Sequence, residues 1–334
     1  MTTVDALVCV EPGRLRLEQR PVPRPGPEEA LVRPLRVGIC GTDYHIFEGT
    51  QPFLAYPRVM GHELAVEIVE APAGSDLPLG EVCVVNPYIA CGRCIACRNG
   101  KPNCCVRLSV LGVHQDGGMT GLLSVPVGNL VRAPAMTPDQ CATVEFLAIG
   151  AHAVRRGAVT AGDRVLVVGA GPIGLGTALF ARLAGANVIL YDRDAERAQA
   201  VGLIAGATVL PGGTDPSEAQ GEGFDVVFDA TGSARAMEKG FDFVAHGGRY
   251  VFVGLVSESI TFMDPDFHRK EMTLLASRNA TSQDFERVLA AIRDGNVAVQ
   301  RLITHRTRPA DAARDISRWA SNKAGLIKAL VVFE

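Results

Sequence analysis

The sequence lacks three features that would assign it to nucleic acid, a membrane or the cell exterior. Its 334 residues carry a formal net charge of −3, so it has no basic excess of the kind that nucleic-acid binding requires. No apolar stretch reaches the roughly 18 residues of a transmembrane span. No basic segment precedes an apolar run near the start, as a signal peptide would require. We therefore expect a cytoplasmic protein, in a compartment where thiols stay reduced.

Cysteine is sparse except in one place, where five of the nine cysteines fall within fifteen residues. The odd total and the lack of a secretory context argue against disulfides. A redox CxxC is disfavoured because the first βαβ pattern lies far downstream. The spacing of Cys91, Cys94, Cys97 and Cys105 suits a structural zinc site of four thiolates. Cys104 has the wrong spacing for the fourth ligand and is predicted to be a spare thiol.

The hydrophobic pattern changes once along the chain. Residues 1–35 alternate apolar and polar residues between prolines, which indicates short antiparallel strands. Later, the runs "RVLVV", "NVILY", "ATVL", "FDVVFDATG", "GRYVFVG" and "MTLLA" predict six strands that alternate with helical stretches or loops. Such alternation implies a parallel sheet with right-handed crossovers. Residues 211–223 are predicted to form a loop, and the last apolar run is predicted to return to the β-rich part.

The fold class that we predict is therefore α/β, with two domains. Residues 1–148 and 280–334 would form an irregular β-rich domain that carries the zinc lobe at 91–105. Residues 149–279 would form a doubly wound, six-stranded parallel sheet.

A glycine-rich segment, "GAGPIG", directly follows the first of these strands and opens a helix. In this context its glycines let the backbone approach a pyrophosphate at the helix N-terminus. Asp192 ends the next strand, where a carboxylate can accept hydrogen bonds from ribose hydroxyls and repel a 2′-phosphate. NAD is therefore favoured over NADP, although Arg193 would soften that choice, and a tight turn in an unliganded domain is the alternative. The predicted cofactor residues are Gly169, Gly171, Pro172, Ile173, Gly174, Asp192, Arg193 and Arg197.

Cys40 in "VGICGTDYHIFEG", with His62 and Glu63 in "VMGHELAVEIVE", would be ordinary residues if each stood alone. Together with the cysteine lobe, "VEFLAIGAHA" and "GAGPIG", their order and spacing resemble the zinc-dependent medium-chain alcohol and polyol dehydrogenases. The resemblance runs essentially from end to end. It implies a GroES-like catalytic domain, a Rossmann domain that binds NAD, and two zinc ions per subunit, one catalytic and one structural.

The resemblance also implies the ligands of the catalytic zinc, namely Cys40, His62 and Glu145. This sequence departs from the family pattern at Phe146, where a proline usually follows the glutamate. Glu63 is the alternative carboxylate ligand. Three protein ligands leave an open fourth position, which is typical of catalytic zinc, and the oxygen ligand would allow another divalent ion to substitute.

The chemistry implied is oxidation of a hydroxyl that zinc stabilises as an alkoxide, with hydride transfer to the nicotinamide. By resemblance, Thr42 and His45 would relay the proton to solvent. Asp43 would orient a ligand histidine or, equally, would form a turn.

For the substrate, the chain resembles the sugar-acid branch, the L-galactonate and L-gulonate 5-dehydrogenases, through "SVLGVHQDGGM", "AHAVRRG" and "DPDFHRKEMTLLASRNAT". A hexonate oxidised at C5 is expected, with Arg278 binding its carboxylate and Asn279, His114, Gln115 and Asp116 as candidates for its hydroxyls. Each has a structural alternative, either an interdomain ion pair or a turn.

Three other functions stay open: a neutral polyol dehydrogenase of the sorbitol type, an L-threonine dehydrogenase, and an NAD-binding sensor without catalysis. We expect a small-molecule substrate, no nucleic-acid or membrane partner, and a homodimer or homotetramer.

Overall fold

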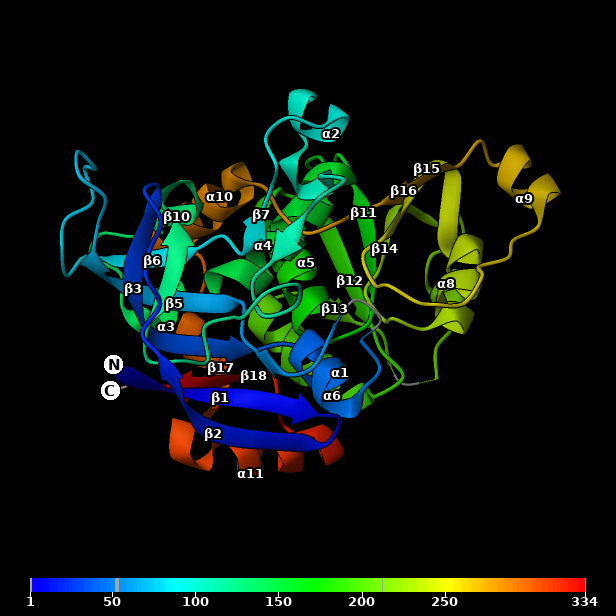
Figure 1. Ribbon diagram of the computed structural model, residues 1–334. Helices are drawn as coiled ribbons and strands as arrows, with labels where there is room; N and C mark the ends of the chain where they lie inside the picture. The colour runs from blue at the N-terminus through cyan, green and yellow to red at the C-terminus, as the bar shows by residue number, and fades with distance from the viewer. Residues whose placement is uncertain (1, 52–53, 212, 334) are drawn as a thin grey trace. The chain divides into compact units, whose positions relative to one another are not determined.

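The computed structural model describes residues 2–51, 54–211 and 213–333. The chain divides into two compact units, one formed by Met1–Glu145 with Thr281–Glu334 and the other by Phe146–Ala280 (Figure 1). Position 212, inside the stretch predicted as a loop, lies outside the described residues.

The first unit contains most of the strands. They are β1 (Thr3–Glu11), β2 (Arg14–Pro21), β3 (Glu29–Ile39), β4 (Arg58–Val59), β5 (Glu63–Glu70), β6 (Val82–Val85), β7 (Tyr88–Ile89), β8 (Ser109–Val110), β9 (Leu123–Pro126), β10 (Leu130–Arg132), β17 (Ile303–Thr307) and β18 (Lys328–Val332). Its helices are α1 (Gly41–Glu48), α2 (Ile95–Arg98), α3 (Pro138–Cys141), α10 (Ser282–Arg293) and α11 (Pro309–Ser321).

The main sheet of this unit has the order β10-β6-β5-β3-β18-β17, with β9 also pairing with β3. β18 runs antiparallel to β3, so the final strand does return to the β-rich part. In the register of this sheet Gly38 lies opposite Glu63 on one side and Leu330 on the other. The end of β3 and the starts of β5 and β18 therefore meet in one place.

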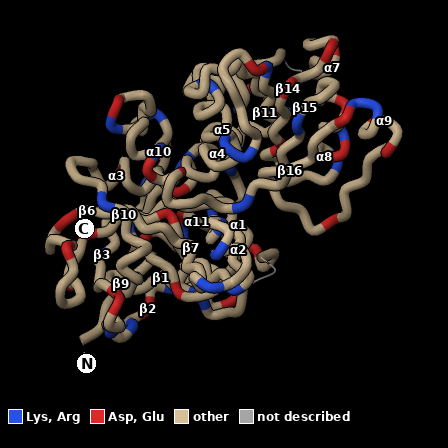
Figure 2. Tube along the Cα trace, turned by 90° about the horizontal axis from the view of Figure 1, so that it is seen from above, with Lys and Arg blue, Asp and Glu red and all other residues tan. Residues whose placement is uncertain are grey.

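The core of the first unit is closed by α11, whose apolar residues recur at helical spacing. Ile316 and Trp319 of this helix belong to the buried cluster under the sheets. β17 was not predicted, because "ITHRT" has few apolar residues, although its ends, Ile303 and Thr307, are buried. Lys, Arg, Asp and Glu are interspersed along the trace (Figure 2). Arg36 and Arg306 pair with Asp139, at 2.8 and 2.6 Å.

The second unit is a parallel α/β structure, and its six-stranded sheet has the order β13-β12-β11-β14-β15-β16. The strands are β11 (Arg164–Val168), β12 (Asn187–Tyr191), β13 (Thr208–Val209), β14 (Phe224–Asp229), β15 (Val244–Phe252) and β16 (Thr273–Ala276). The helices are α4 (Val144–Arg156), which spans the point of division, α5 (Pro172–Leu183), α6 (Ala195–Ala205), α7 (Pro216–Ala219), α8 (Ala234–Gly240) and α9 (Asp264–Arg269).

This sheet confirms the six predicted strands and the doubly wound architecture, which is the dinucleotide-binding strand order. One local prediction was wrong. The stretch predicted to be a loop contains α7, which Asp215 caps by accepting a hydrogen bond from the Ser217 backbone N–H at 2.9 Å. Among the helices of the described ranges, none has the length and apolar character needed to span a lipid bilayer.

Candidate functional site

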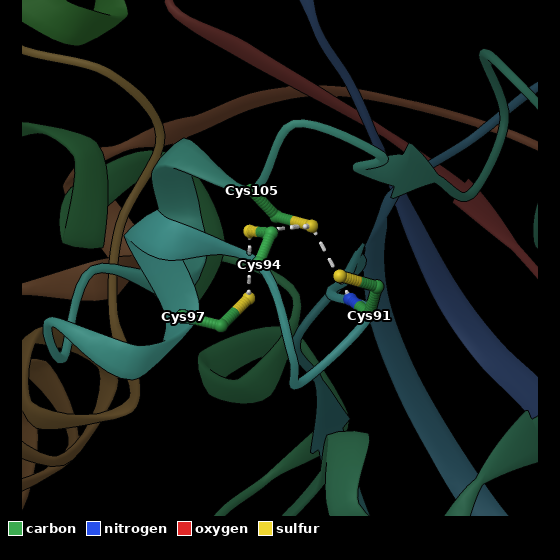
Figure 3. A group of neighbouring side chains, drawn as sticks. All are labelled: Cys91, Cys94, Cys97 and Cys105. Atoms are coloured by element: carbon green, nitrogen blue, oxygen red, sulfur yellow. Dashed lines mark hydrogen bonds between the residues drawn. The ribbon is translucent and has the colours of Figure 1, made fainter.

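The structure brings together the four lobe cysteines predicted to bind zinc. Their sulfur atoms lie within 4.8 Å of one another, and the side chains converge on one point (Figure 3). The Cys94 sulfur is 3.5 Å from that of Cys97 and 3.9 Å from that of Cys105. A tetrahedral ion with Zn–S bonds of ~2.3 Å places its sulfurs about 3.8 Å apart, so the donor set fits zinc.

The surroundings of the lobe favour the thiolate form of Cys91 and Cys94 but not of Cys97. The Arg107 guanidinium, 3.4 Å from the Cys91 sulfur, lowers the pKa of that thiol to about 5. Backbone N–H groups lower the pKa of Cys94 to about 7, whereas burial raises that of Cys97 to about 11. The backbone N–H groups of Cys91 and Arg107 both donate to the Cys105 sulfur at 3.3 Å. The adjacent Cys104 is exposed.

A second group of metal-ligating side chains lies deep in the first unit. The ligand atoms of Cys40, His62 and Glu63 are all within 4.8 Å of one another. Cys40 follows β3 and is the N-cap of α1, and His62 directly precedes Glu63, the first residue of β5. His62 and Glu63 are buried, with 5% and 0% of their surface exposed. Residues far apart in the chain thus meet through the pairing of β3 with β5.

Asp43 holds the two ligand segments together. Its carboxylate accepts the backbone N–H of Cys40 at 2.8 Å and that of Gly61 at 3.2 Å. Burial raises its pKa, against the lowering influence of His62. Asp43 therefore contacts the segment of His62 through the backbone of Gly61, and it also caps the start of α1.

Glu145, the predicted carboxylate ligand, lies in the first turn of α4 and is 3% exposed. The Tyr88 hydroxyl donates a hydrogen bond to Oε1 of Glu145. Burial raises the pKa of Glu145 to about 6, against the lowering influence of His62. Its oxygens are not within the 4.8 Å group that Glu63 completes.

One buried charged residue beside the ligand group was not predicted from the sequence. Lys328, at the start of β18, is buried and its Nζ lies 2.7 Å from both carboxylate oxygens of Glu63. Burial alone would lower the pKa of Lys328. The nearby Glu63 and Cys40 raise it by more, so the pKa is shifted upward overall. The one signal in the sequence was a lysine inside the apolar run "GLIKALVVF", since a buried lysine needs a carboxylate partner.

The deep group fits a catalytic metal ion. The donor set of thiolate, imidazole and carboxylate is one that binds zinc with an open position. Nδ1 of His62 is buried and has no hydrogen-bond partner among the described residues. A buried polar atom without a partner is costly unless something completes it, and a ligand in this region would do so.

The two relay candidates lie on α1. Thr42 Oγ1 is 3.9 Å from the Cys40 sulfur, beside the ligand group. The His45 side chain is 61% exposed, and its Nδ1 lies 3.0 Å from Thr50 Oγ1. One candidate therefore lies at the site and the other in contact with solvent.

In the second unit, the glycine-rich turn has the geometry that the sequence predicted. Gly169 has φ of +101°, in the region that favours glycine. A Cβ on Gly174 would lie 1.8 Å from the Gly169 carbonyl oxygen, so only glycine permits this close contact of helix and turn. Gly171 is the N-cap of α5, with Pro172 at the first helical position followed by Ile173. The turn thus offers open backbone at a helix N-terminus, which fits a pyrophosphate.

Asp192 follows β12 and accepts the Ala170 N–H from the glycine-rich turn at 2.7 Å. It also accepts the Asp194 N–H at 2.9 Å. Arg193 is exposed. Arg197 pairs with Asp194 at 3.4 Å. The carboxylate predicted to bind ribose therefore lies against the turn predicted to bind pyrophosphate.

The substrate candidates of the first unit have structural partners. Nδ1 of His114 accepts the Val110 N–H at 3.1 Å. Asp116 accepts the Val59 N–H at 3.0 Å and pairs with Arg58 at 3.3 Å. The Gln115 side chain donates to Ser109 at 2.8 Å.

The other two substrate candidates belong to the second unit, whereas the ligand group belongs to the first. Arg278 is exposed and follows β16. Asn279 has a positive φ of +52°. Their role at the substrate stays a prediction.

Comparison with known proteins places these features in a family. The chain matches the alcohol dehydrogenase GroES-like domain over residues 26–135 and the zinc-binding dehydrogenase domain over residues 172–294. L-galactonate-5-dehydrogenase from Escherichia coli K12 is 43% identical over 340 residues, which cover 100% of each protein.

Two solved structures share the whole fold. An Escherichia coli CFT073 alcohol dehydrogenase complexed with NADH has a TM-score of 0.93 and 30% identity, over 99% of each chain. A zinc-binding dehydrogenase from Sinorhizobium meliloti 1021 bound to NADP has a TM-score of 0.90 and 30% identity, over 100% of each chain. The chain therefore belongs to the zinc-type medium-chain alcohol dehydrogenases, which are oxidoreductases that act on CH–OH groups.

Proposed function

We propose that the protein oxidises the C5 hydroxyl of a hexonate such as L-galactonate or L-gulonate, with NAD as hydride acceptor and zinc at the deep site. The observation that carries the reaction type is the convergence of the partly buried Cys40 with the buried His62 and Glu63, with Glu145 also buried at the start of α4. The substrate class is supported by the 43% identity to L-galactonate-5-dehydrogenase over the full length.

The metal at this site would be held by Cys40, His62 and one carboxylate, Glu145 or Glu63, and a second zinc by the four lobe cysteines. When bound, the deep zinc supplies Lewis acidity that favours ionisation of a substrate hydroxyl. Residues of α1 then have defined tasks. Thr42, beside Cys40, would take the hydroxyl proton as it gives up its own proton to the relay through the cofactor ribose, and the exposed His45 would pass a proton on to solvent.

The cofactor preference that we propose is for NAD, through Asp192. Its carboxylate lies against the glycine-rich turn, where it would accept ribose hydroxyls and repel a 2′-phosphate. The relatives include one bound to NADH and one bound to NADP, so family membership alone does not set the preference. We also propose that the protein is a cytoplasmic homodimer or homotetramer.

The test is turnover of the metal-loaded protein with NAD or NADP, followed by absorbance of the reduced nicotinamide. The substrates are L-galactonate, L-gulonate, the corresponding alditols and L-threonine. We expect the highest kcat/KM with a hexonate and NAD. A preference for an alditol or for L-threonine would contradict the hexonate assignment in favour of a polyol or threonine dehydrogenase, and no turnover at all would leave a sensor.

Arg278→Ala tests how the acid is recognised. A charge-assisted, bidentate contact contributes roughly 1.5–3 kcal/mol, so we expect kcat/KM for the hexonate to fall about ten- to a hundredfold. The alditol has no carboxylate, so its loss should be much smaller. Arg301→Ala removes another exposed arginine and should leave the acid-to-alditol ratio unchanged. An unchanged ratio in Arg278→Ala would remove that residue from the site.

A further inference from the structure

Lys328 and Glu63 form an ion pair that is closed off from solvent. Their side chains are 1% and 0% exposed, and Nζ lies 2.7 Å from each carboxylate oxygen. Nζ also donates to the carbonyl oxygen of Ile39 at 3.3 Å. Burying two charges is costly even when they are paired, so this pair calls for a functional explanation.

The sheet register brings the pair to the metal site. Gly38 pairs with Glu63 across β3 and β5, and a Cβ at position 38 would lie 2.0 Å from Glu63 Oε2. The glycine therefore makes room for the carboxylate. Lys328 reaches the same carboxylate from β18, on the other side of β3.

Glu63 has two competing partners. One of its oxygens lies within 4.8 Å of the Cys40 sulfur and a His62 nitrogen, in ligand range of the deep metal. The ammonium group of Lys328 already contacts both oxygens and would repel a metal cation drawn toward them. Glu145 differs, since its side chain accepts a hydrogen bond from the neutral hydroxyl of Tyr88, at one oxygen.

We propose that Lys328 is a positioning residue that keeps Glu63 off the catalytic metal, so that Glu145 is the carboxylate ligand and the fourth position stays open. This inference rests on the proposed metal site but not on the hexonate assignment. Without the ammonium group, Glu63 would turn to the metal, hold it more tightly and fill the position that the substrate hydroxyl needs.

The experiment measures metal release from the full chain without substrate. Zinc transfer to a chromophoric chelator is followed for wild type, Lys328→Met, Lys328→Arg, Glu63→Gln and the Lys328→Met/Glu63→Gln double variant. Cys40→Ser, which lacks a deep ligand, identifies the release phase that belongs to the cysteine lobe. Cobalt substitution supplies a second readout, the visible absorption that reports coordination.

We expect release from the deep site to slow tenfold or more in Lys328→Met, with a changed cobalt spectrum and a lower kcat. Lys328→Arg, which keeps the cation, should stay near wild type. In the double variant the slowing should vanish. Glu63→Gln removes the carboxylate that would otherwise turn to the metal and hold it. Glu63→Gln alone leaves the Lys328 ammonium without the Glu63 carboxylate and should release zinc faster than the double variant, which carries neither charge.

Faster release in Lys328→Met would show that Lys328 presents Glu63 to the metal, which overturns the proposal. Slowing that persists in the double variant would show a simple charge effect and would overturn the proposal as well. If Lys328→Met does not fold, the double variant decides alone because it removes both charges, and a release tenfold faster than wild type there would make Glu63 the resident ligand. The metal content of the wild type tests the proposed deep metal site separately. One metal per chain would refute the deep site itself.

Discussion

The cysteine lobe and the deep ligand group are built in opposite ways. The lobe takes four like ligands from fifteen consecutive residues, and Cys91 and Cys97 are only partly buried. The deep group takes unlike ligand atoms from Cys40, after β3, and from His62 and Glu63, where β5 begins. Glu145 and Lys328 are buried as well. Four thiolates complete a tetrahedral ion, whereas three mixed ligands leave a position for substrate.

The two sites therefore differ in whether the coordination shell of the ion is complete and in which charged groups surround the ligands. In the lobe, Arg107 and backbone N–H groups stabilise sulfur charge, so the chain holds one arrangement. At the deep group, Glu63 and Glu145 are the two candidate carboxylate ligands, and they have different partners, Lys328 and Tyr88. The lobe should therefore govern stability and the deep group turnover.

The largest effect expected is on stability, from Cys105→Ser. Cys105 is 5% exposed and accepts two backbone N–H groups, and a structural zinc site contributes directly to folding. We expect loss of the lobe zinc and destabilisation of about 3 kcal/mol or more, a drop of roughly 6–12 °C in Tm. Calorimetry and metal analysis check this.

Cys104→Ser is the matched control, since it removes the neighbouring exposed thiol. It should leave zinc content and Tm close to wild type. Equal damage from both substitutions would contradict the assignment of the fourth ligand.

The next largest effect is on turnover, from Glu145→Ala. The Glu145 carboxylate is buried and is the proposed ligand of the deep metal, not of the lobe zinc. Its removal should therefore lower kcat about a hundredfold or more, roughly 2.7 kcal/mol. NAD should still bind, because the predicted cofactor residues lie in the other unit. Steady-state kinetics, cofactor titration and metal analysis give the three readouts.

Glu145→Gln controls for the lost contact with Tyr88, since the amide oxygen can still accept that hydrogen bond. We expect its turnover to be low as well, because the charge is missing. Near-normal turnover and metal content in Glu145→Ala would mean that Glu63 or water completes the site.

The contrast between lobe and deep group also explains what the sequence could predict. The lobe and the glycine-rich turn depend on residues close together in the chain, so spacing alone indicated both. Lys328 was missed because its partner is 265 residues away and is reached only through the pairing of β18 with β3. The backbone contacts of Asp43 could not be anticipated either, since they depend on how Gly61 lies against Cys40. Predicting Glu145 required the family resemblance, because nothing local connects α4 with Cys40.

The smallest effect expected is on the pH dependence of the lobe, from Arg107→Ala. The guanidinium is the main cause of the low pKa of Cys91, about 5. At pH 7 that sulfur therefore binds metal without displacing a proton. Without Arg107 the pKa should rise toward the ordinary value of a cysteine thiol, 9.0, and protons should then compete with the metal.

The competition between protons and zinc at Cys91 predicts the direction of the pH effect and the pH range in which it appears. Above about pH 9 both proteins present a thiolate, so their zinc affinities should converge. As the pH falls from about 9 to 5, the Cys91 sulfur of the variant takes up a proton that the wild type does not. The apparent zinc affinity of the variant should therefore fall increasingly below that of wild type. At pH 7 we expect a loss of roughly three- to tenfold, because backbone N–H groups continue to stabilise the sulfurs.

Chelator competition across this pH range checks the curve, in a Cys40→Ser background so that only the lobe binds metal. Arg98→Ala is the control, because Arg98 belongs to the same lobe but donates to the Arg93 carbonyl oxygen. If the two arginine variants lose affinity equally, general positive charge stabilises the lobe. A loss confined to Arg107→Ala, growing as the pH falls, would assign the effect to its contact with the Cys91 sulfur. The lobe would then hold its ion partly through one arginine outside the ligand set, as Lys328 is proposed to act on the deep group.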